Sequence, residues 1–286
     1  MNTKNLFSHK QMQTIYSVIR YVIAVLALFI IGIPILYGIT NAFKLNSEIL
    51  LSRFFPQSIY FGNFLKVLSD SRVLRGIGNS LYICVFSTII GCLFCLAASV
   101  PIARRKEKIF KIFYFLFISS MIIPPISSFV TLYYIMVKMR LVDNLPAIIL
   151  LFSAQFMIPI GVLIFSSFMK TIPFELEEAA KIEGCGFFKR ILIIIAPLIK
   201  APILSLTILQ FPQVWNEFLL PLLFLRRQEN RPLTLLIYNY TRDHESDYGA
   251  IFALIVVGMT MPLILFLLSR KTIEESISIT TGGIKG

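Results

Sequence analysis

Residues 78–100 read GNSLYICVFSTIIGCLFCLAASV, a continuous apolar stretch without a charged side chain. A helix that crosses the roughly 30 Å hydrocarbon core of a membrane needs about 20 such residues. Comparable stretches recur along the chain, at residues 18–40, 78–100, 112–137, 145–168, 201–225 and 248–269. Long apolar runs without alternating polarity favour helices over the strands of a membrane barrel. The sequence therefore predicts an all-α integral membrane protein with six transmembrane helices.

The composition supports this class. Hydrophobic residues make up 57% of the chain, mean hydropathy is +0.80 and charged residues make up only 15%, against about 25% in soluble domains. The net charge of +12 would suggest nucleic acid in a soluble protein, but here it fits anionic lipid headgroups. We therefore expect a lipid bilayer as partner and no nucleic acid. The stretch 18–40 exceeds the h-region of a signal peptide and is interpreted as a membrane anchor.

The orientation follows from basic residues in short loops, which stay in the cytoplasm. The deciding cluster lies between the second and third stretches: Arg104, Arg105, Lys106, Lys108 and Lys111. We therefore expect a multi-pass protein of the cell membrane with both termini and the segment 170–200 cytoplasmic. The predicted organisation is an N-terminal cytoplasmic segment, a first transmembrane helix and an external loop in residues 1–74, a core of five transmembrane helices in 75–270 and a cytoplasmic tail in 271–286.

The sequence contains no motif for nucleotide hydrolysis. It has no GxxxxGK[ST] phosphate-binding loop, which nucleotide hydrolysis of the common type would require. Glu217 is the only carboxylate inside the six apolar stretches, and the four cysteines have no metal-ligand spacing. We expect a non-catalytic conduit without a metal, a disulfide or a bound cofactor, driven by another protein.

The most specific segment is 170–201, KTIPFELEEAAKIEGCGFFKRILIIIAPLIKA. Its acidic residues after Pro173 suit the positive end of a helix dipole, and Gly184 can end that helix in a left-handed turn. A second amphipathic stretch, 187–195, precedes Pro197. The pattern predicts a helix–turn–helix at the membrane surface.

This segment resembles the EAA loop of ABC-importer permeases. The matching residues are Glu178-Ala179-Ala180, then Gly184 after three residues, then Ile194 and Pro197, although Ala196 replaces the usual Leu before the proline. Further runs resemble the carbohydrate branch of that family, the maltose-permease G-subunit type. They are Gly78-Asn79-Ser80, Ala103-Arg104-Arg105, MIIPP at 121–125, Trp215-Asn216-Glu217-Phe218 and TGGIKG at 281–286.

The resemblance implies a type I importer permease fold and a transporter whose functions are divided among several subunits. The helix around residues 175–184 would be a coupling helix that docks on a cytoplasmic ATPase dimer, which would use ATP and Mg²⁺. A second permease would complete a heterodimer, and an extracytoplasmic solute-binding protein would deliver the solute. The residues expected to serve coupling are Glu175, Glu178, Ala179, Ala180, Gly184 and Pro197.

The resemblance also implies a translocation path for a sugar or oligosaccharide. Candidate path residues are Asn79, Ser80, Gln155, Gln210, Trp215, Asn216 and Glu217. For residues 215–217 the alternative is a structural role, in which these residues form a cluster of hydrogen bonds within the chain. The sequence leaves both interpretations open. A non-sugar solute such as a glycerophosphodiester or polyamine, or a membrane scaffold without transport, are the alternative functions.

Overall fold

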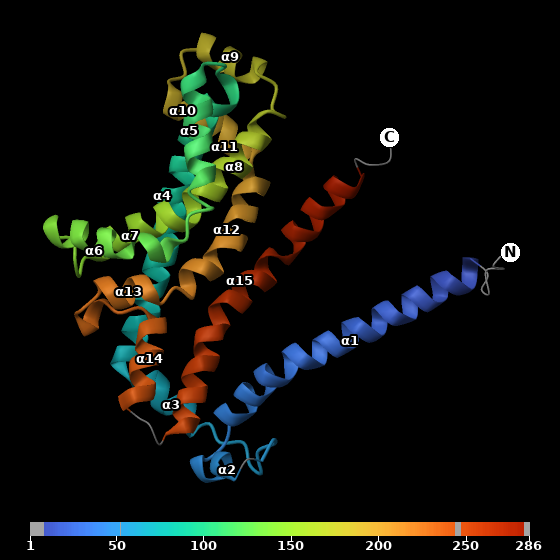
Figure 1. The fold of residues 1–286 in the computed structure, drawn as a ribbon, viewed down its shortest axis with the longest axis vertical. Coiled ribbons are helices and arrows are strands. Elements are labelled where there is room, and N and C mark those ends of the chain that lie inside the picture. Colours follow the sequence, from blue (N-terminus) through green and yellow to red (C-terminus); the bar gives the residue numbers. More distant parts are fainter. Residues whose placement is uncertain (1–8, 52, 244–246, 283–286) are drawn as a thin grey trace. The chain divides into compact units, whose positions relative to one another are not determined.

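The computed structural model describes residues 9–51, 53–243 and 247–282, which form helices and turns without a strand (Figure 1). The chain divides into two compact units, Met1–Val67 with Thr241–Val257, and Leu68–Tyr240 with Gly258–Gly286. The helices are α1 (His9–Ala42), α2 (Asn46–Leu50), α3 (Gly62–Ser69), α4 (Ser71–Arg104), α5 (Lys108–Ser119), α6 (Phe129–Lys138), α7 (Leu145–Phe152), α8 (Ile158–Met169), α9 (Glu175–Ile182), α10 (Phe187–Arg190), α11 (Ala196–Leu198), α12 (Lys200–Trp215), α13 (Leu219–Phe224), α14 (Leu233–Asp243) and α15 (Tyr248–Gly282).

Four of the described helical segments are long and apolar enough to cross a membrane: Met12–Ala42, Ser71–Arg104, Leu145–Met169 and Tyr248–Arg270. They correspond to the first, second, fourth and sixth predicted stretches. A fifth is formed if Phe187–Leu198 and Lys200–Trp215, bent by 81°, count as one broken span. The all-helical membrane fold is therefore confirmed, and two of the six stretches are interrupted.

The third predicted stretch, 112–137, is interrupted in its middle. Helix α5 ends at Ser119, the chain turns, and a 3-10 turn, η1 (Pro125–Ser128), leads into α6. The cause lies in the pair Pro124-Pro125, which removes two backbone donors and disfavours helix in the residue before each ring. The fifth stretch, 201–225, is likewise divided, because α12 ends at Trp215 and α13 begins at Leu219.

The core of the larger unit is built on α4. Helix α4 packs along α8, and α12 packs against both of them. Close approach of the backbones depends on small residues: a Cβ at Gly91 would lie 2.4 Å from Cβ of Met157, and one at Gly161 would lie 2.5 Å from Sγ of Cys95. The buried side chains of this core are Cys92, Cys95, Leu96, Val100, Met157, Val162, Phe165, Met169, Ile172, Ile191, Ile195, Ile199 and Leu206. This packing holds the end of α4 beside α8, and the chain continues from α8 into α9 and α10.

The smaller unit is held together by polar contacts at the end of α1. Asn63 on α3 donates from Nδ2 to the carbonyl oxygens of Ala42 (3.0 Å) and Lys44 (2.8 Å). Lys44 is fully buried, and its ammonium donates to Asn41 Oδ1 at 2.6 Å. Burial lowers the pKa of Lys44, since an apolar environment disfavours the charged form.

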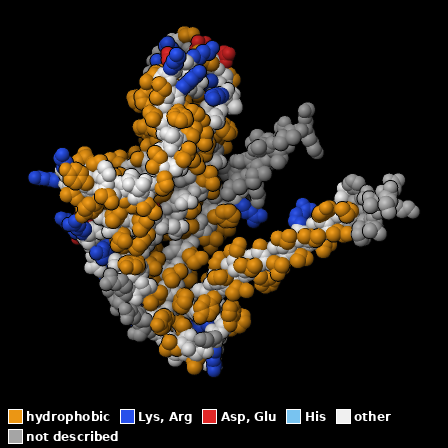
Figure 2. Space-filling model, viewed as in Figure 1, with side chains coloured by type: hydrophobic (Ala, Val, Ile, Leu, Met, Phe, Trp, Pro, Cys, Tyr) orange, Lys and Arg blue, Asp and Glu red, His pale blue; other side chains and the backbone are white. Residues whose placement is uncertain are grey.

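Apolar side chains remain exposed along α1, as Figure 2 shows. A helix with that surface needs lipid or other subunits around it. Charged side chains gather instead over α9 and α10, at the top of the same view. The predicted C-terminal motif 281–286 lies partly outside the described residues, which end at 282.

Candidate functional site

The segment 170–200 folds as the predicted helix–turn–helix. Helix α9 begins at Glu175 and carries three acidic residues in its first turn, where they complement the exposed N–H groups. Pro173 lies just before the helix, so its missing N–H leaves the helical hydrogen bonds intact. The helix ends at Ile182, and α10 begins after the turn at Phe187.

Gly184 shapes the turn. Its φ is +80°, a left-handed conformation that glycine adopts without a steric penalty. The N–H of Cys185 donates to the carbonyl oxygen of Ala180 (2.9 Å), and the N–H of Gly184 donates to that of Lys181 (3.1 Å). This pair of bonds is the Schellman pattern that satisfies carbonyls at a helix end. The predicted positive φ of Gly184 is confirmed.

The residues expected to serve coupling fall on two faces of α9. Glu175, Glu178 and Ala179 are exposed, whereas Ala180 is buried, at 4% exposure. Ala180 therefore packs against its own chain, and Ala179 is the small residue open to a partner. Pro197 is exposed in the first turn of α11, just before the bend at Ile199.

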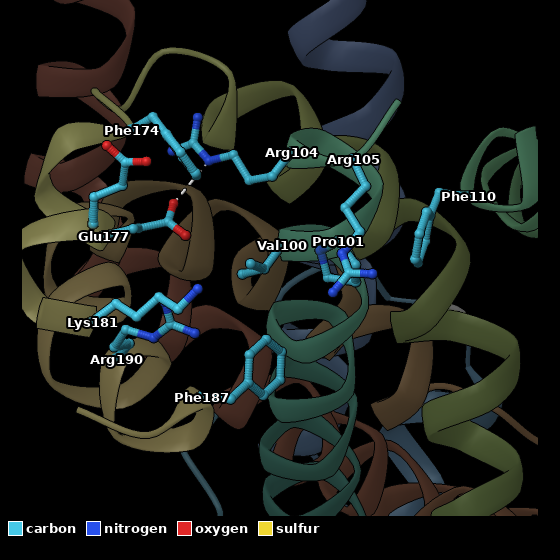
Figure 3. Close-up of a pocket in the computed structure, with 11 residues that line it drawn as sticks. Val100, Pro101, Arg104, Arg105, Phe110, Phe174, Glu177, Lys181, Phe187 and Arg190 are labelled. Atoms are coloured by element: carbon cyan, nitrogen blue, oxygen red, sulfur yellow. Dashed lines mark hydrogen bonds and ion pairs between the residues drawn. The ribbon is translucent and has the colours of Figure 1, made fainter. Parts of the chain in front are cut away.

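An ion pair ties α9 to the end of α4. Arg104 Nε lies 2.8 Å from Glu177 Oε1, with side-chain exposures of 14% and 6%. Arg104 Nη2 also donates to the carbonyl oxygen of Ile172 at 2.9 Å, and its guanidinium lies 5.7 Å from the centre of the Phe174 ring. Figure 3 shows the pair as a dashed line. Arg104 thus joins the end of α4 to Glu177 on α9 and to Ile172 and Phe174 in the segment just before α9.

The sequence analysis did not include Glu177 among the candidate residues. The two partners are 73 positions apart, so no local pattern pairs them. A signal was nevertheless present, because Glu177 lies three residues before Ala180 and helical spacing places both on the inner face.

The candidates near the other end of α4 hold a loop in place. Asn79 Nδ2 donates to the carbonyl oxygens of Glu229 (2.7 Å) and Arg231 (3.1 Å). Ser80 Oγ accepts from the N–H of Leu233 at 2.8 Å, and Leu233 is the first residue of α14. Both side chains therefore form hydrogen bonds with backbone groups of residues 229–233.

The group 215–217 marks the interruption between α12 and α13. Trp215 is buried, donates from Nε1 to the carbonyl oxygen of Gly258 at 2.9 Å and stacks on Phe211. Glu217 Oε1 accepts from the N–H of Leu220 at 3.0 Å, which caps a free donor at the start of α13. Asn216 is exposed at the break. The geometry of Trp215 and Glu217 favours a structural cluster of hydrogen bonds over a role in lining the translocation path.

Gln155 and Gln210 line one cavity, which we name the path cavity. Its volume is about 700 Å³, and its walls come from the turn after α5, the π-helical segment η2 (Ser153–Met157) and α12. The lining residues are Ser120, Met121, Ile123, Pro125, Ser128, Leu151, Ala154, Gln155, Phe156, Pro159, Ile160, Gln210 and Gln213. The interruption of the third stretch thus contributes to an open hollow in which a few polar side chains lie among apolar ones.

Comparison with known proteins adds an independent line of evidence. Residues 85–274 match the family model described as "Binding-protein-dependent transport system inner membrane component". The chain is 30% identical over 255 residues to the melibiose/raffinose/stachyose import permease protein MelC of Bacillus subtilis, covering 89% of this chain and 91% of that one.

Two solved structures share the fold. The first is a bacterial ABC transporter involved in import of the acidic polysaccharide alginate, with a TM-score of 0.77, 18% identity and coverage of 94% and 99% of the two chains. The second is a bacterial alginate ABC transporter in complex with an alginate pentasaccharide-bound periplasmic protein, with a TM-score of 0.64, 14% identity and coverage of 92% and 96%. The chain therefore shares the fold of these two transporter chains. Because the family model spans most of the chain, this protein belongs to the binding-protein-dependent transport system inner membrane components.

Proposed function

We propose that this permease subunit carries a neutral sugar or oligosaccharide through the path cavity. The single observation behind this proposal is the chemistry of the cavity wall. Three glutamine amides line it beside apolar side chains, and none of its described lining residues is charged. The hydroxyls of Ser120 and Ser128 donate to carbonyl oxygens of their own chain and so offer only acceptors. Amides both donate and accept hydrogen bonds, as sugar hydroxyls require, and Phe156 adds an aromatic face.

The same wall argues against the two charged alternatives. A polyamine would leave cationic groups without carboxylates, and a glycerophosphodiester would leave an anion without a basic partner. Moving an unpaired charge into such a site carries a large desolvation penalty. The relative MelC is named for import of melibiose, raffinose and stachyose, which are neutral saccharides, and this supports the same choice.

The driving force would come from partners. We propose that a second permease completes the path, that a binding protein delivers the solute and that a cytoplasmic ATPase dimer uses ATP and Mg²⁺, so that this chain is not itself an enzyme. The exposed face of α9, with Glu175, Glu178 and Ala179, would dock on the ATPase. In this arrangement α9 and both termini are cytoplasmic, in accordance with the basic segment 104–111.

Coupling would then follow from the ion pair. Closure of the ATPase dimer would move α9, and Arg104 would transmit that movement to α4, which forms the core with α8 and α12. A ligand shifts such an equilibrium only by its difference in affinity for the two states. ATP bound to the closed dimer would supply that difference.

A solute panel tests the proposal. The chain would be reconstituted in liposomes with its partner permease, ATPase and binding protein, and ATP-driven uptake of raffinose, spermidine and glycerophosphocholine measured. We expect uptake of the saccharide alone. Uptake of spermidine or glycerophosphocholine without raffinose would refute the sugar assignment, and failure of the ATPase to co-purify would favour a scaffold.

A variant of the path cavity sharpens the test. Gln210→Leu removes an amide at nearly constant volume, and we expect saccharide uptake to fall roughly three- to tenfold because a hydrogen bond contributes about 0.5–1.5 kcal/mol. Gln228→Leu, outside the cavity, is the matched control. Equal uptake by both variants and the wild type would remove Gln210 from the path.

A further inference from the structure

A second cavity lies where α4, α5, α9 and α10 meet, and we name it the cation pocket. Its volume is about 440 Å³, within the range of small-molecule sites. Six of its lining residues are charged: Arg104, Arg105, Lys181, Arg190, Glu177 and Glu178. Figure 3 shows Lys181 and Arg190 pointing into the space from α9 and α10, and Arg105 reaching in from the end of α4.

The charges of the cation pocket do not balance internally. Glu177 is engaged by Arg104 in the buried ion pair, so Glu178 is the one remaining carboxylate among the described lining residues, and it is exposed. The wall also carries three basic side chains that are not part of this ion pair: Arg105, Lys181 and Arg190. The pocket therefore carries an excess of about two positive charges.

Arg190 supplies a separate indication of a missing partner. Its Nε atom is buried and has no hydrogen-bond partner among the described residues. A buried donor without an acceptor is destabilising, and a guanidinium offers its N–H groups as a fork that fits the oxygens of a planar or tetrahedral anion. The position of this atom on the wall of a hollow makes a bound acceptor the natural way to satisfy it.

We propose that the cation pocket binds the phosphate group of a phosphorylated ligand. A phosphate offers several strong acceptor oxygens and one to two negative charges, which matches three converging cations better than a single carboxylate does. Phe110 and Phe187 add apolar walls for the remainder of the ligand. The phosphate could belong to the headgroup of an anionic phospholipid or to a soluble phosphate ester.

A phosphate bound in the cation pocket would restrict the movement of α9. The ligand would bridge Lys181 on α9, Arg190 on α10 and Arg105 after α4, and so fasten the surface helices to the core beside the Arg104–Glu177 pair. Binding of the phosphate does not require the proposed sugar transport, because it can be measured without a solute. Its failure is therefore distinct from a failure of the proposed function.

The test uses the full chain, assembled with its partner subunits, in nanodiscs of phosphatidylcholine. One arm adds increasing phosphatidylglycerol to the bilayer, and the other adds glycerol 3-phosphate to the solution. The readout is the midpoint of thermal unfolding of this chain, which rises when a ligand binds the folded state. The variants are Arg190→Gln and Lys181→Gln, with Lys170→Gln, an exposed cation outside the pocket, as the matched control.

We expect at least one probe to raise the midpoint of the wild type and of Lys170→Gln. Arg190→Gln and Lys181→Gln should each need about tenfold more of the same probe, since a charge-assisted hydrogen bond is lost. A response to phosphatidylglycerol alone identifies a lipid headgroup, and a response to glycerol 3-phosphate identifies a soluble ester. Using two pocket variants protects the test against misfolding of either one.

Two results would overturn the proposal. The first is an equal response of the wild type and both pocket variants to each probe, including no response at all. The second is a loss of the co-purifying ATPase in Arg190→Gln with its response to the phosphate probes unchanged. That outcome would assign the cation pocket to a carboxylate of a protein partner instead.

Discussion

Helix α9 and the break at residues 215–217 are both polar features of an apolar chain, yet their side chains are used differently. On α9, Glu178 and Ala179 are exposed. At the break, Trp215 donates to Gly258 and Glu217 accepts from Leu220. A side chain whose hydrogen bonds are made inside the chain supports the architecture, and one that faces outward is open to a partner.

This difference in hydrogen bonding distinguishes among the polar residues that the sequence proposed for the translocation path. Asn79 and Ser80 resemble Glu217, since backbone groups of the same chain occupy them. Gln155 and Gln210 differ because they line the path cavity. Buried polar groups are nearly always paired, so the pairing of each group is more informative than its presence in a span.

The largest expected effect concerns the buried ion pair. Arg104→Ala leaves Glu177 buried without its partner, which destabilises a fold by about 3–5 kcal/mol. Trypsin cleavage of the detergent-solubilised protein within residues 170–200 should accelerate by at least about 100-fold, because cleavage follows the population of the open loop.

Two controls accompany Arg104→Ala. Lys108→Ala removes an exposed cation nearby and should leave the cleavage rate unchanged. The double variant Arg104→Met/Glu177→Leu removes both charges and should recover most of the resistance. If Arg104→Ala resists trypsin as well as the wild type does, α9 is not fastened to α4 by this pair.

A smaller effect is expected at the turn after α9. Gly184→Val places a β-branched residue at φ +80°, which costs roughly 1–2 kcal/mol. Gly186→Val is a matched control, because Gly186 has φ −64° and a Cβ at either glycine meets no atom within 4 Å. We expect normal membrane abundance for both variants and impaired uptake for Gly184→Val alone. Equal uptake by the two would show that the left-handed turn is dispensable.

The smallest expected effect tests the break itself. Glu217→Ala removes the acceptor for the N–H of Leu220, and loss of such a cap destabilises by about 1 kcal/mol. Glu217→Gln keeps an acceptor oxygen and should keep near-normal abundance. Protein abundance and uptake per molecule would be measured for both. Reduced uptake per molecule in Glu217→Gln at normal abundance would return Glu217 to the translocation path.

Hydropathy and turn chemistry predicted much of the fold. The stretch 78–100 lies within α4, because a long apolar run has one stable conformation in a membrane. Gly184 predicted the end of α9, because the left-handed turn at a helix end favours glycine. In both cases the information is local to the chain.

The remaining features depend on contacts between distant segments. The ion pair joins positions 104 and 177, and the burial of Ala180 depends on what packs beneath α9. The prolines at 124 and 125 signalled a bend, but hydropathy averages across a short interruption and predicted one continuous span. The path cavity arises from that interruption together with the π-helical segment η2, which no propensity specifies.

We propose that the outer face of α9 docks on the ATPase while its inner face packs against the rest of the chain. Adjacent residues test it directly: Ala179→Cys and Ala180→Cys, each in a Cys185→Ser background because Cys185 is partly exposed. The measurement is the rate of maleimide labelling with and without the assembled ATPase. We expect fast labelling at position 179 that falls roughly tenfold or more on assembly, with slow labelling at position 180 throughout. Labelling at position 179 at one rate in both states would contradict it.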